Sequence, residues 1–290
     1  MRAAVPLIAA AALSACAPAV VEAQPAPAQG EPIVLGRSYR LKSAAFGDER
    51  VINVALPAGY ETEPSKTYPV LYLIDGGVDQ DFVHIVGAEQ LGAAWGRMRD
   101  VVVVGIASKD RRRELVGPTR DPALLAKYPT AGHSALFRKL LRDEVKPFVA
   151  ARFRTNGKSG VIGESLAGLF IAETYLREPD LFDSYAAISP SLWWDDARLS
   201  REAAALIGAR QSGRRLYLAT ANEGSDMQAN VDRMLAALGK ARDWCYAPRE
   251  DLTHATIYHT IAPTALQFLF PSDTPPDPQS GFDVTCSKKS

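Results

Sequence analysis

The residue best placed to do chemistry is Ser165, in the stretch VIGESLAGLF at 161–170. A strand-like run precedes it and a helix-like run follows, which is the layout of a nucleophile elbow. In such an elbow a tight turn holds a serine hydroxyl clear of a sheet. Gly163 and Ala167 are small enough to let the two backbones close around the turn, so the pattern is G-x-S-x-A rather than G-x-S-x-G. The alternative is a serine that caps an amphipathic helix.

A serine hydroxyl needs a base to become a nucleophile, and neutral imidazole serves near neutral pH. We predict that His254, which follows the last strand-like run, is this base rather than a surface histidine. A carboxylate should orient the imidazole and stabilise its cation. Glu223 is the preferred acid; Asp226 is the alternative, although it could instead cap the following helix. A Ser165–His254 dyad without an acid stays open.

Acyl transfer at Ser165 also needs amide donors for the developing oxyanion. We expect one from Leu166, the residue after the serine, and another from the Gly76-Gly77 loop. Glycines in an ordinary turn are the alternative for that loop.

Substrate contacts are predicted for Trp193, Trp194 and Arg113, the last from the cluster 111–113. Stacking and cation–π contact would suit an aromatic, acidic or catecholate group. Core tryptophans and a solvated basic loop are the alternatives.

Strands and helices must bring these distant residues together. Strand-like runs are found at 51–56, 69–74, 101–106, after the Asn156-Gly157 turn, and at 184–188, 216–220 and 244–247. Helical patterns alternate with them, which favours an α/β fold with one mostly parallel, doubly wound sheet covered on both faces. Ligands of such sheets bind outside the carboxyl ends of the strands. The candidate residues follow strands, so we expect them at one edge.

Three local expectations complete the outline. The segment 108–132 is predicted as a long loop, functional or disordered, and Ser134 as the N-cap of the next helix. His254 is placed in a loop before a closing helix that has Pro263 near its first turn.

Length and charge limit the function. With 290 residues, 47% of them hydrophobic, the chain can bury one large α/β domain, expected at 32–271. The net charge is zero, so no global field recruits nucleic acid or an anionic membrane. A small-molecule substrate is therefore expected; the oligomeric state is left open.

The first residues resemble a secretory signal. Arg2 precedes an apolar run at 3–13 that is too short to span a bilayer, and we predict a signal segment at 1–23 followed by a flexible linker at 24–31. Leu13-Ser14-Ala15-Cys16 resembles a bacterial lipobox, which would acylate Cys16; cleavage after Ala23 is the alternative. We expect export to the periplasm or outer envelope, with membrane contact only through that lipid anchor.

Two cysteines remain after Cys16, namely Cys245 and Cys286. In an oxidising compartment they could form a disulfide that ties the polar, proline-rich tail (272–290) to the strand around Cys245. Two free thiols are the alternative.

Several blocks in order resemble the Putative esterase branch of the α/β-hydrolase superfamily, which includes enterobactin and salmochelin esterases and related carbohydrate esterases. They are 55–60, 68–76, 103–106, 163–170, 179–182 and 189–194. The resemblance implies an α/β-hydrolase fold and ester hydrolysis by Ser165 and His254 without metal or organic cofactor. Family elbows usually read Gly-His-Ser-x-Gly-Gly, whereas Glu164 and Ala167 replace the histidine and the first glycine here. Siderophore esters and aryl or acetyl esters on sugars both fit as substrates.

Two rival functions remain beside a secreted or envelope-anchored serine esterase. An acyltransferase would use the same fold and pass the acyl group to an alcohol. A non-catalytic binding lipoprotein would keep a vestigial elbow, and the complete Ser165 and His254 set argues against it.

Overall fold

The computed structural model describes residues 30–208, 211–239 and 243–287. The chain divides at Leu35, and the unit that begins there holds the strands and helices. The predicted signal segment and most of the predicted linker lie outside the described residues. In the part of the chain that is described, no helix has the length and apolar character needed to cross a membrane.

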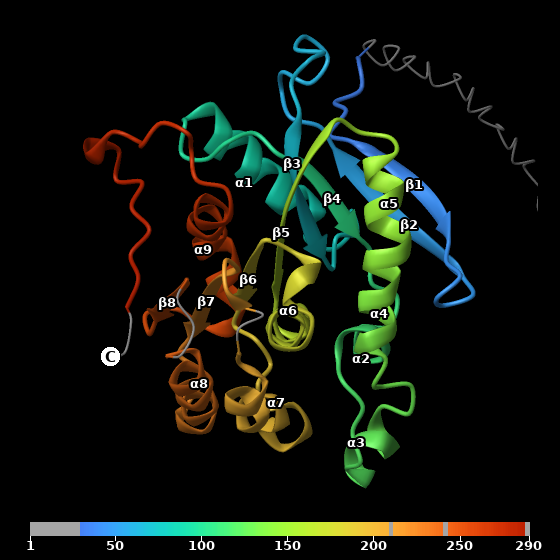
Figure 1. The fold of residues 1–290 in the computed structure, drawn as a ribbon, viewed down its shortest axis with the longest axis vertical. Coiled ribbons are helices and arrows are strands. Elements are labelled where there is room, and N and C mark those ends of the chain that lie inside the picture. Colours follow the sequence, from blue (N-terminus) through green and yellow to red (C-terminus); the bar gives the residue numbers. More distant parts are fainter. Residues whose placement is uncertain (1–29, 209–210, 240–242, 288–290) are drawn as a thin grey trace, which may run out of the picture. The chain divides into compact units, whose positions relative to one another are not determined.

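An eight-stranded sheet forms the centre of this unit, in the order β1-β2-β4-β3-β5-β6-β7-β8 (Figure 1). β2 pairs antiparallel with β1 and β4, and the other neighbours pair in parallel, which confirms the predicted sheet. The strands are β1 (Arg37–Lys42), β2 (Glu49–Ala55), β3 (Tyr68–Ile74), β4 (Val102–Ile106), β5 (Thr155–Glu164), β6 (Ser184–Ile188), β7 (Arg215–Ala221) and β8 (Trp244–Arg249).

Helices cover both faces of the sheet (Figure 1). They are α1 (Phe82–Ala94), α2 (Arg111–Leu115), α3 (Pro122–Lys127), α4 (Ser134–Leu140), α5 (Lys146–Ala150), α6 (Leu166–Arg177), α7 (Trp194–Leu206), α8 (Ser225–Leu238) and α9 (His254–Leu269). A π-helical turn, Leu141–Val145, joins α4 to α5, and the 3₁₀ turns are Pro179–Leu181 and Pro278–Ser280.

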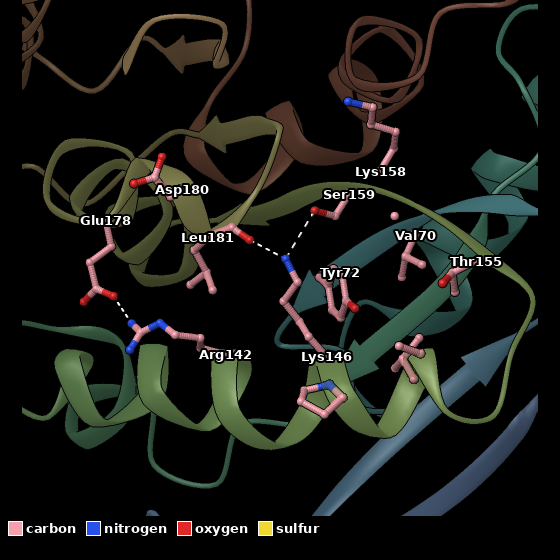
Figure 2. A pocket seen from close by; sticks show the side chains of 14 residues that line it. Val70, Tyr72, Arg142, Lys146, Thr155, Lys158, Ser159, Glu178, Asp180 and Leu181 are labelled. Carbon is pink, nitrogen blue, oxygen red and sulfur yellow. Dashed lines mark hydrogen bonds and ion pairs between the residues drawn. The ribbon is translucent and has the colours of Figure 1, made fainter. Parts of the chain in front are cut away.

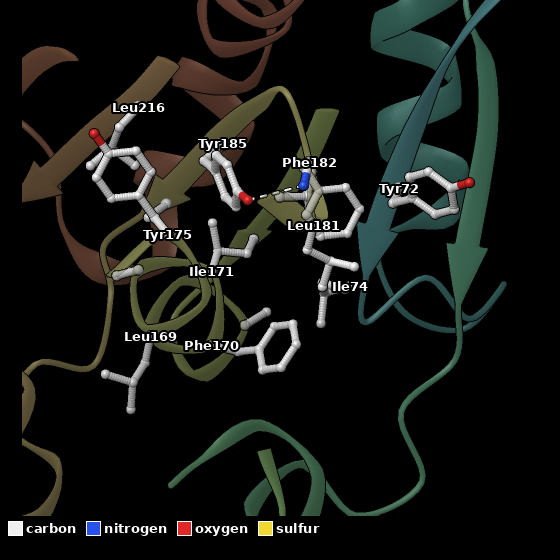
Figure 3. Close-up of a cluster of buried hydrophobic side chains, with 14 of the residues drawn as sticks. Tyr72, Ile74, Leu169, Phe170, Ile171, Tyr175, Leu181, Phe182, Tyr185 and Leu216 are labelled. Atoms are coloured by element: carbon white, nitrogen blue, oxygen red, sulfur yellow. Dashed lines mark hydrogen bonds between the residues drawn. The ribbon is translucent and has the colours of Figure 1, made fainter. Parts of the chain in front are cut away.

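Alternate residues of the central strands serve two separate cores. Tyr72 and Ile74 of β3 pack with the helices on one face, whereas Leu71 and Leu73 pack with α1 and α9 on the other. A strand buried on both sides needs the continuous apolar run seen in the sequence. In Figure 3, side chains of α6 such as Phe170 lie beside Phe182, which comes just before β6, and Tyr185, which lies near its start. The first core therefore holds the helix behind Ser165 against the sheet.

The structure corrects several local predictions. The segment 108–132 contains two short helices, α2 and α3, capped by the side chains of Asp110 and Asp121. Ser134 is the first residue of α4 rather than its N-cap, and no side chain caps α8, so Asp226 does not do so. α9 begins at His254 itself, which places Pro263 inside the helix.

A disulfide joins Cys245 of β8 to Cys286, with the Cα atoms 5.0 Å apart. Beside it, the Ser287 amide donates to the Tyr246 carbonyl over 2.7 Å. The structure thus contains the hypothesised link between the tail and the edge strand instead of two free thiols.

Candidate active site

Ser165 stands at the apex of a tight turn between β5 and α6. Its backbone has φ 61° and ψ −117°, a strained conformation for a residue with a side chain, and one that occurs at functional sites. The Ser165 amide donates to the Ile188 carbonyl over 3.0 Å, and the Ser165 carbonyl accepts from the Ser191 amide over 3.0 Å. These bonds to the end of β6 and the loop beyond it hold the turn in place. The predicted strand–serine–helix turn is present.

Small residues make this turn possible. A Cβ atom added to Gly163 would lie 2.6 Å from the Cβ of Ala167, and one added to Gly168 would lie 2.6 Å from the Ile188 carbonyl oxygen. Such contacts are too short for a side chain. Ala167 is therefore tolerated in place of the usual glycine because its neighbour across the turn, residue 163, has no side chain.

His254 and Glu223 are in direct contact. The imidazole Nδ1 lies 3.1 Å from Glu223 Oε1, and the Ser189 hydroxyl donates to the same carboxylate oxygen. A carboxylate only accepts, so Nδ1 carries the proton and Nε2 is left as a proton acceptor. The hydrogen bond that His254 donates to Glu223, with further attraction from Glu164, raises the pKa of His254 above its usual range. Asp226 is exposed in the first turn of α8, so Glu223 is the acid in contact.

The serine and the imidazole lie at one edge of the sheet, but no hydrogen bond joins them. Ser165 Oγ lies 3.3 Å from Ser191 Oγ, and its described contacts include no hydrogen bond to His254. The His254 side chain does interact electrostatically with Glu164, the residue before the serine. Catalytic hydrogen bonds are often long before substrate binds, so this geometry is compatible with a base that closes onto Ser165.

Glu164 brings an unusual carboxyl group to the elbow. Its Oε1 atom is buried and has no hydrogen-bond partner among the described residues. Burial raises the pKa of Glu164 to about 7, although the attraction of His254 partly opposes this. Near neutral pH the group beside the nucleophile is therefore poised between its neutral and charged forms.

Arg111, rather than Arg113, is the arginine of the basic cluster that reaches the elbow. Its Nε atom lies 2.8 Å from Asp75 Oδ2, and its Nη2 atom lies 3.5 Å from the Glu164 carbonyl oxygen. The Arg113 guanidinium instead lies 5.3 Å from the Phe46 ring centroid. The described contacts thus give Arg113 a packing role, and the sequence could not separate neighbours in a run of arginines.

The two tryptophans differ in their surroundings. Trp194 is 5% exposed, and its indole Nε1 donates to the Gly117 carbonyl over 3.3 Å, so it belongs to the core. Trp193 is 44% exposed and packs edge-on against Trp194. Trp193 is therefore the one of the pair that keeps a surface for a ligand.

The three predicted oxyanion donors differ in whether their amides are available to a ligand. The Gly76 amide donates to the Ile106 carbonyl over 2.9 Å, and a Cβ at this position would lie 2.3 Å from Gly105 Cα, so this glycine serves strand packing. The Gly77 amide donates to the Gln80 side chain over 2.9 Å, which a ligand oxygen could displace. Leu166 begins α6, where amides lack intrahelical partners. Leu166 and Gly77 stay as the predicted donors.

Ser189 and Ser191 were not singled out as site residues by the sequence reasoning. Both follow β6 at the edge where Ser165 follows β5, and Ser189 has a positive φ of 40°. Their position after a parallel strand already places the block 189–194 at this edge in the sequence, although the sequence assigns neither serine a role. Among the described residues, no group of three or more His, Cys, Asp or Glu side chains is arranged to hold a metal ion.

A mostly parallel sheet, a strained serine between a strand and a helix, and a His–Glu pair at the same edge define a protein of the α/β-hydrolase class. The chain belongs to the family described as "Putative esterase", whose model matches residues 43–246.

Curated relatives and solved structures agree with this assignment. The chain is similar to the ferri-bacillibactin esterase of Bacillus subtilis, 28% identical over 55% of this chain and 60% of the relative. It is also similar to the siderophore triacetylfusarinine C esterase of Aspergillus fumigatus, 27% identical over 56% of this chain and 58% of the relative. The chain thus matches less than two thirds of the length of these relatives. An IroE-like serine hydrolase from Shewanella oneidensis is 26% identical, with a TM-score of 0.70 over 81% of this chain and 80% of the other.

Proposed function

We propose that this protein is a serine esterase that cleaves carboxylic esters through an acyl-enzyme on Ser165. The contact between His254 Nδ1 and Glu223 Oε1, at the edge where the strained Ser165 turn stands, is the observation that supports this most. It leaves the imidazole Nε2 as a base and provides a carboxylate that stabilises the imidazolium.

In the proposed reaction His254 Nε2 takes the proton of Ser165 as the hydroxyl oxygen attacks the ester carbonyl. The amides of Leu166 and Gly77 would stabilise the negative oxygen of the tetrahedral intermediate. The ester's alcohol leaves with the proton from His254, and the acyl group stays on Ser165. Water then attacks the acyl-enzyme with His254 as base, which releases the carboxylic acid and restores the serine.

For the substrate we propose a siderophore ester. The curated relatives are named as esterases of ferri-bacillibactin and triacetylfusarinine C, which supports this class over acetyl or aryl esters of sugars. Trp193 offers an exposed aromatic surface for such a ligand.

We also propose that the protein is exported, with Cys16 as the site of a lipid anchor. The signal-like segment 1–23 supports export, and the disulfide between Cys245 and Cys286 is of the kind that persists in oxidising compartments. Metabolic labelling with an alkyne fatty acid should mark the wild type and leave Cys16→Ser unmarked; equal labelling would exclude an anchor at that cysteine.

Hydrolysis of short-chain nitrophenyl esters and of ferric siderophores, by wild type and Ser165→Ala, tests the proposed chemistry. We expect the variant to lose at least about 10³-fold in kcat/KM, because removal of a triad nucleophile leaves only binding and oxyanion contributions. Ser134→Ala is the matched control, since Ser134 also stands at a helix start but in α4.

Activity that survives in Ser165→Ala would contradict the proposal. Products from reactions with added alcohols distinguish the rival acyltransferase: free acid is expected, whereas predominant transfer to the alcohol would favour that rival.

A further inference from the structure

A cavity of about 610 Å³ lies at the opposite end of the sheet from Ser165. Its walls are formed by Val70 and Tyr72 of β3, the first part of β5, and α5, as Figure 2 shows. Ser159 of β5 lines this cavity, whereas Ser165 directly follows the other end of the same strand. At the rise of an extended strand, the two serines are about 20 Å apart. The proposed esterase chemistry makes no use of this space.

Irregular backbone borders the cavity. Gly157 has φ 80°, and the register between β3 and β5 shifts between Tyr68 and Val70. Across from these strands, the π-helical turn Leu141–Val145 comes immediately before Lys146. Pro147, which has no amide hydrogen, explains why the helix is distorted there. Bulges and π-turns of this kind are frequent beside binding sites because they redirect side chains.

Lys146 points from α5 into the cavity (Figure 2). Its ammonium group donates to the Leu181 carbonyl and lies 3.4 Å from the Ser159 hydroxyl. No carboxylate of the described residues forms an ion pair with it, although the side chain is half-buried. An ammonium group has three hydrogens to donate, so Lys146 can still serve an acceptor on a ligand.

The acids around the cavity are already engaged. Glu178 pairs with Arg138 and Arg142, and Asp180 pairs with Arg214 over 3.4 Å. Lys158 also lines the cavity, and its Nζ atom lies 3.8 Å from Oδ1 of Asp183, a residue that does not line it. Among the described residues that line the cavity, Lys146 is thus the one positively charged side chain that has no ion pair with a carboxylate. Burial lowers the pKa of Lys146, although Asp183 partly opposes this. An anion in the cavity would favour the ammonium form.

We propose that this cavity is a second binding site, for a small carboxylate with a flat apolar body. Lys146 Nζ would bind the carboxylate, and the apolar body would lie against the side chains of Tyr72, Val70 and Val149. The size of the cavity falls in the range of small-molecule sites, which are mostly apolar with a few placed polar groups.

Binding of 2-naphthoate and of its uncharged analogue 2-naphthamide to the full-length protein, measured by calorimetry, tests this site. We expect 2-naphthoate to bind saturably, and at least 10-fold more tightly than the amide, because only the acid offers a charge to Lys146. Lys146→Met should weaken 2-naphthoate binding at least 10-fold. Lys139→Met is the matched control, because Lys139 lies on α4, does not line the cavity and pairs with Asp143 on the surface. It should change the affinity less than 2-fold.

A second variant, Ala150→Trp, distinguishes loss of the binding site from loss of folding in Lys146→Met. Ala150 is exposed and lines the cavity, so an indole there would fill the space and leave Lys146 intact. We expect this variant to keep the melting temperature of the wild type and to lose 2-naphthoate binding. No saturable binding to the wild type, equal affinity for acid and amide, or full affinity in Lys146→Met or Ala150→Trp would overturn the proposal.

Discussion

His254 and Glu223 form the pair on which the pH dependence of the proposed reaction rests. Glu223 raises the pKa of His254 because the carboxylate stabilises the imidazolium form. The base must be neutral to act, so kcat/KM should rise with pH through that pKa, at a higher pH than for an ordinary histidine.

Glu223→Gln should therefore move the rise in kcat/KM to lower pH and reduce its plateau by between about 10- and 10⁴-fold, because an uncharged partner orients the imidazole less firmly. A pH–rate profile with a nitrophenyl ester measures both effects. Asp226→Asn is the control. Asp226 lies three residues after Glu223, in the first turn of α8, and its substitution should leave the pH–rate profile unchanged. The reverse pattern, with a shift only in Asp226→Asn, would reassign the acid.

Burial of Glu164 should make the stability of the fold depend on pH, with the folded protein more stable at low pH than at high pH. Burial raises its pKa to about 7 from 4.5, so the folded chain holds a proton that the unfolded chain releases. Stability from the neutral group is full below pH 4.5 and is lost as the pH rises through about 7. Glu164→Gln cannot ionise, so its melting temperature should exceed that of the wild type at pH 8 and match it at pH 4. Equal shifts at both pH values would contradict this account; Glu61→Gln, at an exposed position, is the control.

At the scale of elements, the close approach of α6 to the end of β6 is what fixes the elbow. A Cβ on Gly168 would lie 2.6 Å from the Ile188 carbonyl oxygen and 3.1 Å from Pro190 Cα, so the helix could not keep its place. Gly168→Ala should lower the free energy of unfolding by about 1–3 kcal/mol, as overpacking does.

Gly87→Ala provides the matched change in a helix. Nothing lies within 4 Å of a Cβ added there in α1, so the substitution should stabilise the protein by about 0.5–1 kcal/mol through helix propensity alone. Urea denaturation of both variants measures the difference. A neutral or stabilising Gly168→Ala would show that the contact between α6 and β6 is not needed.

Long apolar runs were the elements that the sequence predicted well. β6 (Ser184–Ile188) has the predicted bounds, because a strand buried on both faces is continuous in hydrophobicity. The helices α2 and α3 were missed because they are too short for a periodic pattern. Their signal was the side-chain caps, Asp110 and Asp121. The start of α9 was also misplaced, although Thr253 and Thr256 form a capping box there.

At the scale of the whole molecule, chain order was enough to predict which loops meet but not which side chains turn toward one another. Ser165, Glu223 and His254 each follow a strand of the sheet, so the topology brings them to one edge. Whether Arg111 or Arg113 reaches the elbow, and whether Gly76 keeps a free amide, depends on packing between segments distant in sequence. Gly105, for example, decides the role of Gly76 through a contact that no local pattern predicts.

The central claim is that folding makes one serine of this chain nucleophilic. Labelling with a fluorophosphonate, followed by peptide mass spectrometry, tests it most directly. We predict a single phosphonyl adduct on Ser165, absent from Ser165→Ala and formed much more slowly in His254→Ala. An adduct on Ser191, whose hydroxyl oxygen lies 3.3 Å from that of Ser165, or labelling at Ser165 that does not depend on His254, would contradict the account.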